Sequence, residues 1–157
     1  MKIRKTARIL LLNEQNQLLL FHMINGINQS GTVWFSPGGG VEDNETYEEA
    51  AQRELKEETG ITTQVEWGPV VWIREIDLIW KGTKNRFIEH YYLAYVRHIS
   101  ISLAHMTTLE KENYLSHHWW TLQELEETAE NIFPIHIATH LRPIINGHIP
   151  KKPISIL

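Results

Sequence analysis

The chain has 157 residues, of which 42% are hydrophobic and 22% are charged, and its formal net charge is -4. This length suits one compact domain, and the composition excludes a disordered, collagen-like or coiled-coil protein. No apolar run approaches the roughly 18 residues that a membrane span needs. Because the chain has no cysteine, disulfides, zinc–thiolate sites, iron–sulfur clusters and thiol catalysis are also excluded.

The charge balance and the first residues bear on partners and location. The excess of acidic over basic residues argues against nucleic acid as the main partner. A basic start, Lys2–Arg8, precedes the apolar run Ile9–Leu12, which is too short for the hydrophobic part of a signal peptide. We therefore expect a cytoplasmic protein with no membrane partner, and a homodimer is left open.

Strand-like segments come first in the chain. Ala7–Leu12 and Leu18–His22 are apolar, and the polar stretch Asn13–Asn16 between them predicts a hairpin connection. The Asn-, Gly- and Ser-rich stretch Asn25–Gly31 predicts a loop, and Val33–Phe35 predicts a short strand.

A helix is predicted over Thr46–Thr59, which contains mostly strong helix formers and no Gly or Pro. Thr46 as N-cap with Glu49 three residues later forms a capping box, in which each side chain accepts a hydrogen bond from an otherwise unpaired backbone N–H group. Gly60 follows as a left-handed helix stop.

Segments rich in β-branched and aromatic residues follow the helix and predict further strands: Gln64–Trp67, Val70–Trp80 and Arg86–Val96. Lys81–Asn85 predicts the turn between the two long strands. The period-two alternation of Ile99–Leu103 predicts an edge strand, and Thr121–Ala129 and Pro134–Ile145 predict helices. Strands on both sides of a central helix indicate an α/β or α+β fold with a mixed sheet.

Three carboxylates share one face of the predicted helix. At 100° per residue, Glu58 lies about 40° from Glu54 and Glu57 lies about 60° from it in the other direction. Such crowding of like charge is unfavourable unless a divalent cation neutralises it. Oxygen ligands on a rigid helix suit Mg²⁺ or Mn²⁺, and the glycines just upstream, Gly38–Gly40, allow a backbone carbonyl to approach as a further ligand.

A solvated acidic face is the alternative explanation for an arbitrary Glu-rich helix. Against it stands a wider pattern of nine constraints, formed by Gly39, Glu45, Arg53, Glu54, Leu55, Glu57, Glu58, Gly60 and Ile61. With average residue frequencies, chance would produce this pattern in such a chain with a probability of about 10⁻⁷. The pattern resembles the signature of the Nudix hydrolases, with no departure.

The resemblance implies the Nudix fold, a mixed β-sheet sandwiched between helices, in a single domain over residues 1–157. Its marks cover about residues 4–125, because the segment His118–Leu125 is similar to a Trp and Glu-Leu element that opens a late helix in many members. The C-terminal helix and tail, residues 130–157, are not distinctive.

The activity implied is metal-dependent hydrolysis of the pyrophosphate bond of a nucleoside diphosphate linked to another moiety, by attack of water on phosphorus. By resemblance, Glu57 and Glu58 are the principal ligands of Mg²⁺ or Mn²⁺. Glu54 is a further ligand or the base that accepts the proton of the water, and the carbonyl of Gly38 is an additional ligand.

Two other features of the site are expected by resemblance. Arg53 and Glu45 should pair and hold the loop against the helix. Many relatives also place a metal-binding or basic carboxylate in a loop shortly before the Trp element. Glu112 is the candidate here, with Glu110 nearby and Glu89 in a strand as alternatives.

The substrate is a small nucleotide, and its identity is left open. Alternation places Trp72 and Arg74 on one face of a strand, where they could stack on a base and contact phosphate, and Arg86 is a further phosphate candidate. Core packing and an exposed strand edge are the structural alternatives. The marks of ADP-ribose and dinucleoside polyphosphate hydrolases are missing, so a nucleoside triphosphate is the residual expectation. A non-catalytic nucleotide-binding module with a Nudix fold is the alternative function, but such proteins tend to lose the glutamates that are all present here.

Overall fold

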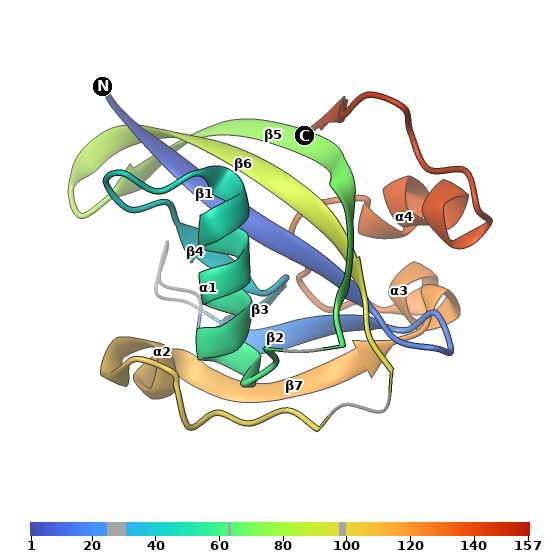
Figure 1. Cartoon of the computed structure of the whole chain (residues 1–157). Helices are drawn as coiled ribbons and strands as arrows, with labels where there is room; N and C mark the ends of the chain where they lie inside the picture. Colours follow the sequence, from blue (N-terminus) through green and yellow to red (C-terminus); the bar gives the residue numbers. More distant parts are fainter. Residues whose placement is uncertain (25–30, 63, 98–99) are drawn as a thin grey trace.

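The computed structural model describes residues 1–24, 31–62, 64–97 and 100–157, and its strands form one mixed sheet (Figure 1). The strands lie in the order β3-β2-β1-β6-β5-β8, with β4 paired to β1 and β7 paired to β2. They are β1 (Lys2–Leu12), β2 (Leu18–Ile24), β3 (Thr32–Phe35), β4 (Gly38–Gly40), β5 (Glu66–Trp80), β6 (Thr83–Tyr95), β7 (Tyr114–Trp120) and β8 (Ile154–Ile156).

Strand β1 organises the sheet. It runs parallel to β6 over its whole length, from the pair Lys2↔Asn85 to the pair Leu12↔Tyr95. On its other side it pairs with the glycine-rich β4, and it meets β2 only at Leu12↔Leu18. The sheet therefore separates beside the middle of β1, and β4 occupies the space between β1 and β2.

Helices cover both faces of the sheet. They are α1 (Tyr47–Thr59), α2 (Thr108–Asn113), α3 (Leu122–Glu127) and α4 (Ile137–Ile145). Alternate residues of β1 supply the two cores, because Ile9 and Leu11 pack on the α1 side while Leu10 and Leu12 pack on the side of α3 and α4. This arrangement confirms the expected mixed sheet between helices.

The central helix α1 has the ends that its sequence predicts. Thr46 and Glu49 form the reciprocal capping box, and Gly60 adopts the left-handed conformation with φ 76°. The helix buries Ala50, Ala51 and Leu55 against the sheet, which fixes the direction of its other faces. No helix among the described residues is long and apolar enough to cross a bilayer.

Several elements differ from the prediction. The segments expected as two strands form one bulged strand, β5. Residues 101–103 form no strand, since the backbone N–H of Ser102 donates to the carbonyl of Thr59 instead of to a strand partner. Ile99 and residues 25–30, which include most of an expected loop, lie outside the described residues. Strands β4, β7 and β8 and helix α2 were not predicted.

Candidate active site

Two buried carboxylates of α1 face the glycine-rich strand β4. Glu54 and Glu58 are each only 7% exposed. One oxygen of Glu58 accepts a hydrogen bond of 3.1 Å from the backbone N–H of Gly38. The carboxylate of Glu54 fills the space where a side chain at Gly39 would lie. Gly39 is thus needed because the backbone of β4 approaches the carboxylate of Glu54 closely.

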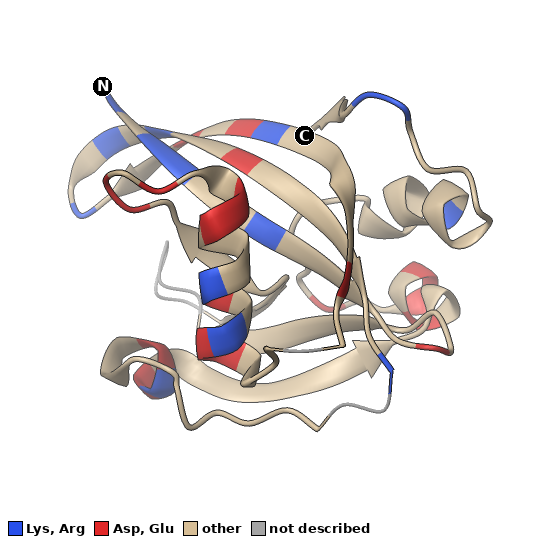
Figure 2. Ribbon diagram, viewed as in Figure 1, with Lys and Arg blue, Asp and Glu red and all other residues tan. Residues whose placement is uncertain are grey.

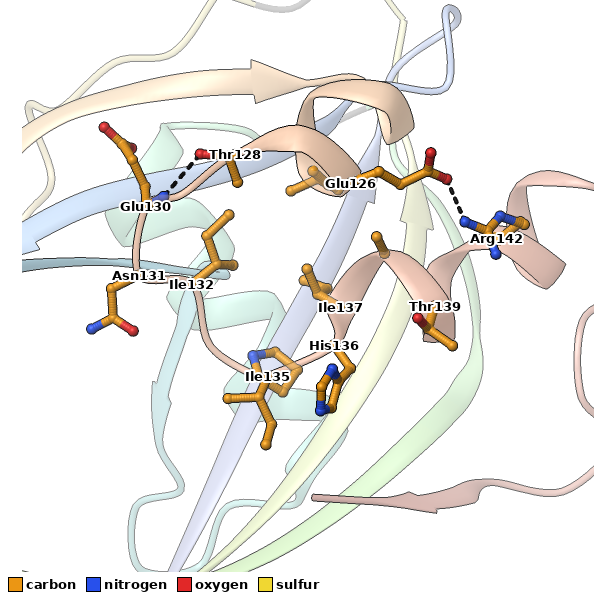
Figure 3. A pocket seen from close by; sticks show the side chains of 13 residues that line it. Glu126, Thr128, Glu130, Asn131, Ile132, Ile135, His136, Ile137, Thr139 and Arg142 are labelled. Carbon is orange, nitrogen blue, oxygen red and sulfur yellow. Dashed lines mark hydrogen bonds and ion pairs between the residues drawn. The ribbon is translucent and has the colours of Figure 1, made fainter.

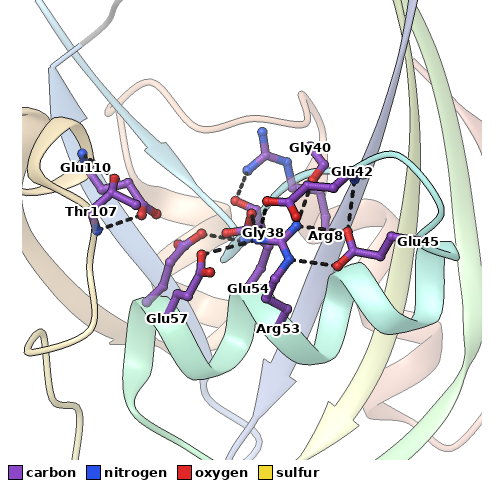
Figure 4. Close-up of polar contacts among 11 residues, drawn as sticks. Arg8, Gly38, Gly40, Glu42, Glu45, Arg53, Glu54, Glu57, Thr107 and Glu110 are labelled. Carbon is purple, nitrogen blue, oxygen red and sulfur yellow. Dashed lines mark hydrogen bonds and ion pairs between the residues drawn. The ribbon is translucent and has the colours of Figure 1, made fainter.

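A third carboxylate reaches the same place from another part of the chain. Glu110, on α2, places a carboxylate oxygen within 4.8 Å of oxygens of Glu54 and Glu58. Figure 4 shows α2 beside α1, with Glu110 on the side of the acidic residues of α1. These three residues are called the acidic cluster below, and they join α1 to a segment about fifty residues further along the chain.

The electrostatics of the acidic cluster suit a cation. Burial raises the pKa of Glu58 well above its ordinary value of 4.5, and the negative charges of Glu54 and Glu110 raise it further. Burial also raises the pKa of Glu54, although hydrogen bonds from Glu58 and Arg53 oppose this shift. A divalent ion would remove the repulsion, and carboxylate oxygens are the ligands that Mg²⁺ and Mn²⁺ prefer. The residues present therefore fit such an ion.

Arg53 ties the loop before α1 to the carboxylates. Its guanidinium donates two hydrogen bonds to Glu45, at 2.7 and 3.0 Å, and one to the carbonyl of Gly40 at 2.9 Å. The same group donates to Glu54 at 2.9 Å and to Glu57 at 3.3 Å. The hydrogen bonds from Arg53 lower the pKa of Glu45. The structure thus contains the expected pair of Arg53 and Glu45.

Two expected ligands lie beside the acidic cluster and have protein partners. Glu57 is bonded to Arg53, and its side chain is partly exposed. The carbonyl of Gly38 accepts a hydrogen bond of 3.3 Å from Arg8. Their roles as metal ligands stay predictions.

The structure brings a different glutamate from the expected one to the site. Glu110, rather than Glu112, belongs to the acidic cluster. The two residues lie about 200° apart around α2, so Glu112 is on the opposite side and is exposed. Glu89, the other alternative, is buried between Arg8 and Arg74, at 3.3 and 2.6 Å. The capping-box spacing of Thr107 and Glu110 could have predicted that a helix begins at this point of the chain.

The residues expected at the substrate are not brought together. Trp72 is 1% exposed and packs against Tyr91 and against His140 of α4, so it cannot stack on a nucleobase. Arg74 is buried and bonded to Glu89. Arg86 makes two hydrogen bonds to Asp77, at 2.8 and 3.2 Å, and alternation places it on the other face of the sheet.

Two hollows are lined by Arg8, which also bonds the carbonyl of Gly38 next to the acidic cluster. One is a pocket of about 270 Å³ between β5, β6 and the aromatic side chains of Phe35 and Phe133. The other is a groove of about 860 Å³ lined by basic residues of β1, by the end of β4 and by the acidic loop that follows it. Figure 2 shows basic positions on β1 near the acidic loop and the acidic start of α1.

A third hollow, of about 430 Å³, lies between α3 and α4 (Figure 3). It shares no lining residue with the two hollows at Arg8. Polar groups in its wall are bonded to one another, as in the pair of Arg142 and Glu126.

Comparison with known proteins identifies the family of the chain. The model of the NUDIX domain matches residues 2–140, so the chain belongs to the NUDIX domain family. The expectation drawn from the glutamate-rich signature is thereby confirmed.

Individual relatives match over shorter stretches. An RNA pyrophosphohydrolase of Erythrobacter litoralis (strain HTCC2594) is 34% identical over 65 residues, which are 41% of this chain and 38% of that protein. An RNA pyrophosphohydrolase of Marinomonas sp. (strain MWYL1) is 45% identical over 58 residues, 37% of this chain and 33% of that protein. The matched stretches thus span less than half of these curated relatives.

Solved structures share the fold over most of the chain. The MutT protein from Methanosarcina mazei Go1 superposes with a TM-score of 0.67 at 22% identity, covering 96% of this chain and 97% of that one. A C. elegans Ap4A hydrolase in a binary complex superposes with a TM-score of 0.64 at 21% identity, covering 92% and 96%. At these identities the likeness concerns the fold alone.

Proposed function

We propose that this chain is a metal-dependent pyrophosphohydrolase that cleaves the pyrophosphate bond of a nucleoside diphosphate linked to another moiety. The observation that carries the proposal is the convergence of Glu54, Glu58 and Glu110 within 4.8 Å beside the glycine-rich strand β4. Membership of the NUDIX domain family favours catalysis over a purely binding function.

The roles of the residues follow from their positions. Glu54, Glu58 and Glu110 would hold Mg²⁺ or Mn²⁺, with Glu57 as a further ligand. The ion would neutralise the phosphate oxygens and acidify the attacking water. Glu54 is either a ligand or the group that accepts the proton of the water. Arg53 acts through the carboxylates, because its bonds to Glu54 and Glu57 fix where they point.

The hollows on either side of Arg8 support a placement for the nucleotide. The pocket of about 270 Å³ has apolar walls, which include Phe35 and Phe133, and such walls suit a nucleoside. The basic side of the groove, formed by Lys2, Arg4 and Arg8, suits the remaining phosphates or the attached group. The opposite side carries the acidic residues Glu42, Asp43 and Glu45. Arg8 bonds the carbonyl of Gly38, and the N–H of Gly38 bonds Glu58. Arg8 therefore connects these hollows to the acidic cluster.

Three expectations about surroundings stay predictions: a cytoplasmic location, a homodimer as an open alternative, and no main partner among nucleic acids. Two relatives are RNA pyrophosphohydrolases, so the 5′-triphosphate end of a short RNA belongs among the candidate substrates. A nucleoside triphosphate offers the same phosphates without the chain of nucleotides.

The proposal is tested by incubating the purified chain with Mg²⁺ and a panel of substrates. The panel comprises NTPs, dNTPs, ADP-ribose, dinucleoside polyphosphates, NADH and a 5′-triphosphate RNA, and chromatography measures the release of monophosphate products. We expect release from at least one substrate, and its loss in Glu58→Gln. Tight binding of a nucleotide without product would instead support the non-catalytic binding module.

A further inference from the structure

Glu110 takes part in two arrangements at once. It belongs to the acidic cluster, and it is also the third residue of α2, where it forms a capping box with Thr107. The hydroxyl of Thr107 accepts a hydrogen bond of 3.2 Å from the backbone N–H of Glu110. In return, Oε1 of Glu110 accepts a bond of 3.0 Å from the backbone N–H of Thr107 (Figure 4). This second bond leaves acceptor sites of the carboxylate free for an ion.

The segment before α2 is fixed to α1 immediately ahead of this cap. Met106 is 7% exposed and belongs to the core that contains Leu55 of α1. Further upstream, the backbone N–H of Ser102 donates a bond of 2.8 Å to the carbonyl of Thr59 at the end of α1. Thr107 is therefore the first residue after the buried Met106, and its backbone conformation sets the direction of α2 relative to α1.

Among the described residues, the backbone N–H of Thr107 is the group that bonds the carboxylate of Glu110. The six described residues of α2 include no buried side chain. The charges of Glu54 and Glu58 repel Glu110 and favour a side chain turned away from them. The capping box opposes this repulsion, because it binds the backbone and one carboxylate oxygen of Glu110 together.

We propose that Thr107 is a positioning residue that holds the carboxylate of Glu110 in place for the divalent ion, so that the capping box of α2 is part of the metal site. The inference rests on the proposed function. Partners that orient ligating carboxylates contribute to metal affinity in proteins, and their loss weakens it about 10- to 100-fold.

The test replaces Thr107 by Val, which keeps the shape of the side chain and removes the hydroxyl acceptor. The matched control is Thr121→Val, because Thr121 and Glu124 form the same reciprocal box in α3, with bonds of 3.1 and 2.9 Å, away from the acidic cluster. Thr107→Ser retains the hydroxyl and should restore wild-type behaviour. Electron paramagnetic resonance measures Mn²⁺ affinity without nucleotide, and hydrolysis at varied Mn²⁺ gives the half-maximal concentration.

We expect Thr107→Val to bind Mn²⁺ about 10-fold more weakly, while Thr121→Val and Thr107→Ser bind it like the wild type. Unchanged affinity in Thr107→Val, or an equal loss in Thr121→Val, would overturn the inference. Glu110→Gln supplies a second test that keeps the cap, because Gln also serves in capping boxes. Adding Thr107→Val to Glu110→Gln should weaken Mn²⁺ binding no further, and an additional loss would contradict action through Glu110.

The two proposals can fail separately. If the wild type binds Mn²⁺ through the acidic cluster but hydrolyses no substrate of the panel, the proposed function fails. The comparison of Thr107→Val with Thr121→Val then still decides the positioning role, since it is measured on Mn²⁺ binding alone.

Discussion

A Cβ atom on Gly39 would lie 2.4 Å from Oε1 of Glu54. Cβ atoms are essentially never this close to another heavy atom. A side chain at residue 39 and the observed position of the Glu54 carboxylate are therefore incompatible. Gly39 and Glu54, fifteen residues apart in the motif, are therefore linked by direct contact.

Gly39→Ala should displace Glu54 from the acidic cluster while the fold persists. A misplacement of about 1 Å in a catalytic group can reduce turnover on the order of 100-fold, and we expect a loss of this size in kcat. Gly40→Ala is the comparison, because a Cβ at Gly40 meets nothing within 4 Å. It should retain most of the activity, and equal loss in both variants would contradict the steric account.

Glu110→Gln and Glu112→Gln separate the two candidates for the loop carboxylate. Only Glu110 belongs to the acidic cluster, so its neutral variant should need a higher Mg²⁺ concentration and turn over more slowly. Glu112→Gln should behave like the wild type, since Glu112 is exposed on the far side of α2. Titration of activity with Mg²⁺ distinguishes them, and the reverse ranking would restore Glu112 as the candidate.

Glu57→Gln should remove most of the turnover and leave the fold intact, because family resemblance makes Glu57 a principal metal ligand. Glu48→Gln removes a carboxylate from an exposed position of the same helix and is the control. Hydrolysis is compared with the circular dichroism spectrum of each variant. Normal turnover in folded Glu57→Gln would contradict the assignment of Glu57 as a principal metal ligand.

Stabilisation by metal should increase with pH. Burial raises the pKa of Glu58 above 4.5, so without metal the folded state holds a proton that the unfolded state has lost. The stability of the metal-free protein therefore falls as pH rises from about 4.5 through the folded pKa. Metal replaces the proton and should raise the melting temperature more at pH 8 than at pH 5.

Thermal melts with and without Mn²⁺ at the two pH values measure this difference. The side chain introduced by Glu58→Gln does not titrate, so the effect of Mn²⁺ on the melting temperature of this variant should depend less on pH. A melting temperature raised equally by Mn²⁺ at both values in the wild type would count against competition between metal and proton at Glu58.

Local signals predicted the centre of the site. The capping box of Thr46 and the stop at Gly60 fix α1 from adjacent residues, so the shared face of Glu54 and Glu58 could be derived from helical geometry alone. The pair of Arg53 and Glu45 was expected from the family resemblance, not from helical geometry.

Long-range packing decided the features that the sequence left open. Which glutamate near residue 110 joins the cluster depends on Met106 entering the core and Ser102 bonding to Thr59, and neither contact has a local signal. Alternation placed Trp72 and Arg74 on one face of β5 but could not show that α4 covers Trp72. The edge strand expected at residues 101–103 failed because the backbone there found the end of α1 as its partner.

Binding of Mn²⁺ to the purified chain, followed by electron paramagnetic resonance in the wild type and in the double variant Glu54→Gln/Glu58→Gln, tests most directly whether the acidic cluster is a metal site. The account predicts uptake by the wild type, with and without nucleotide, and its loss in the folded double variant. No uptake by the wild type, or equal uptake by both proteins, would contradict it.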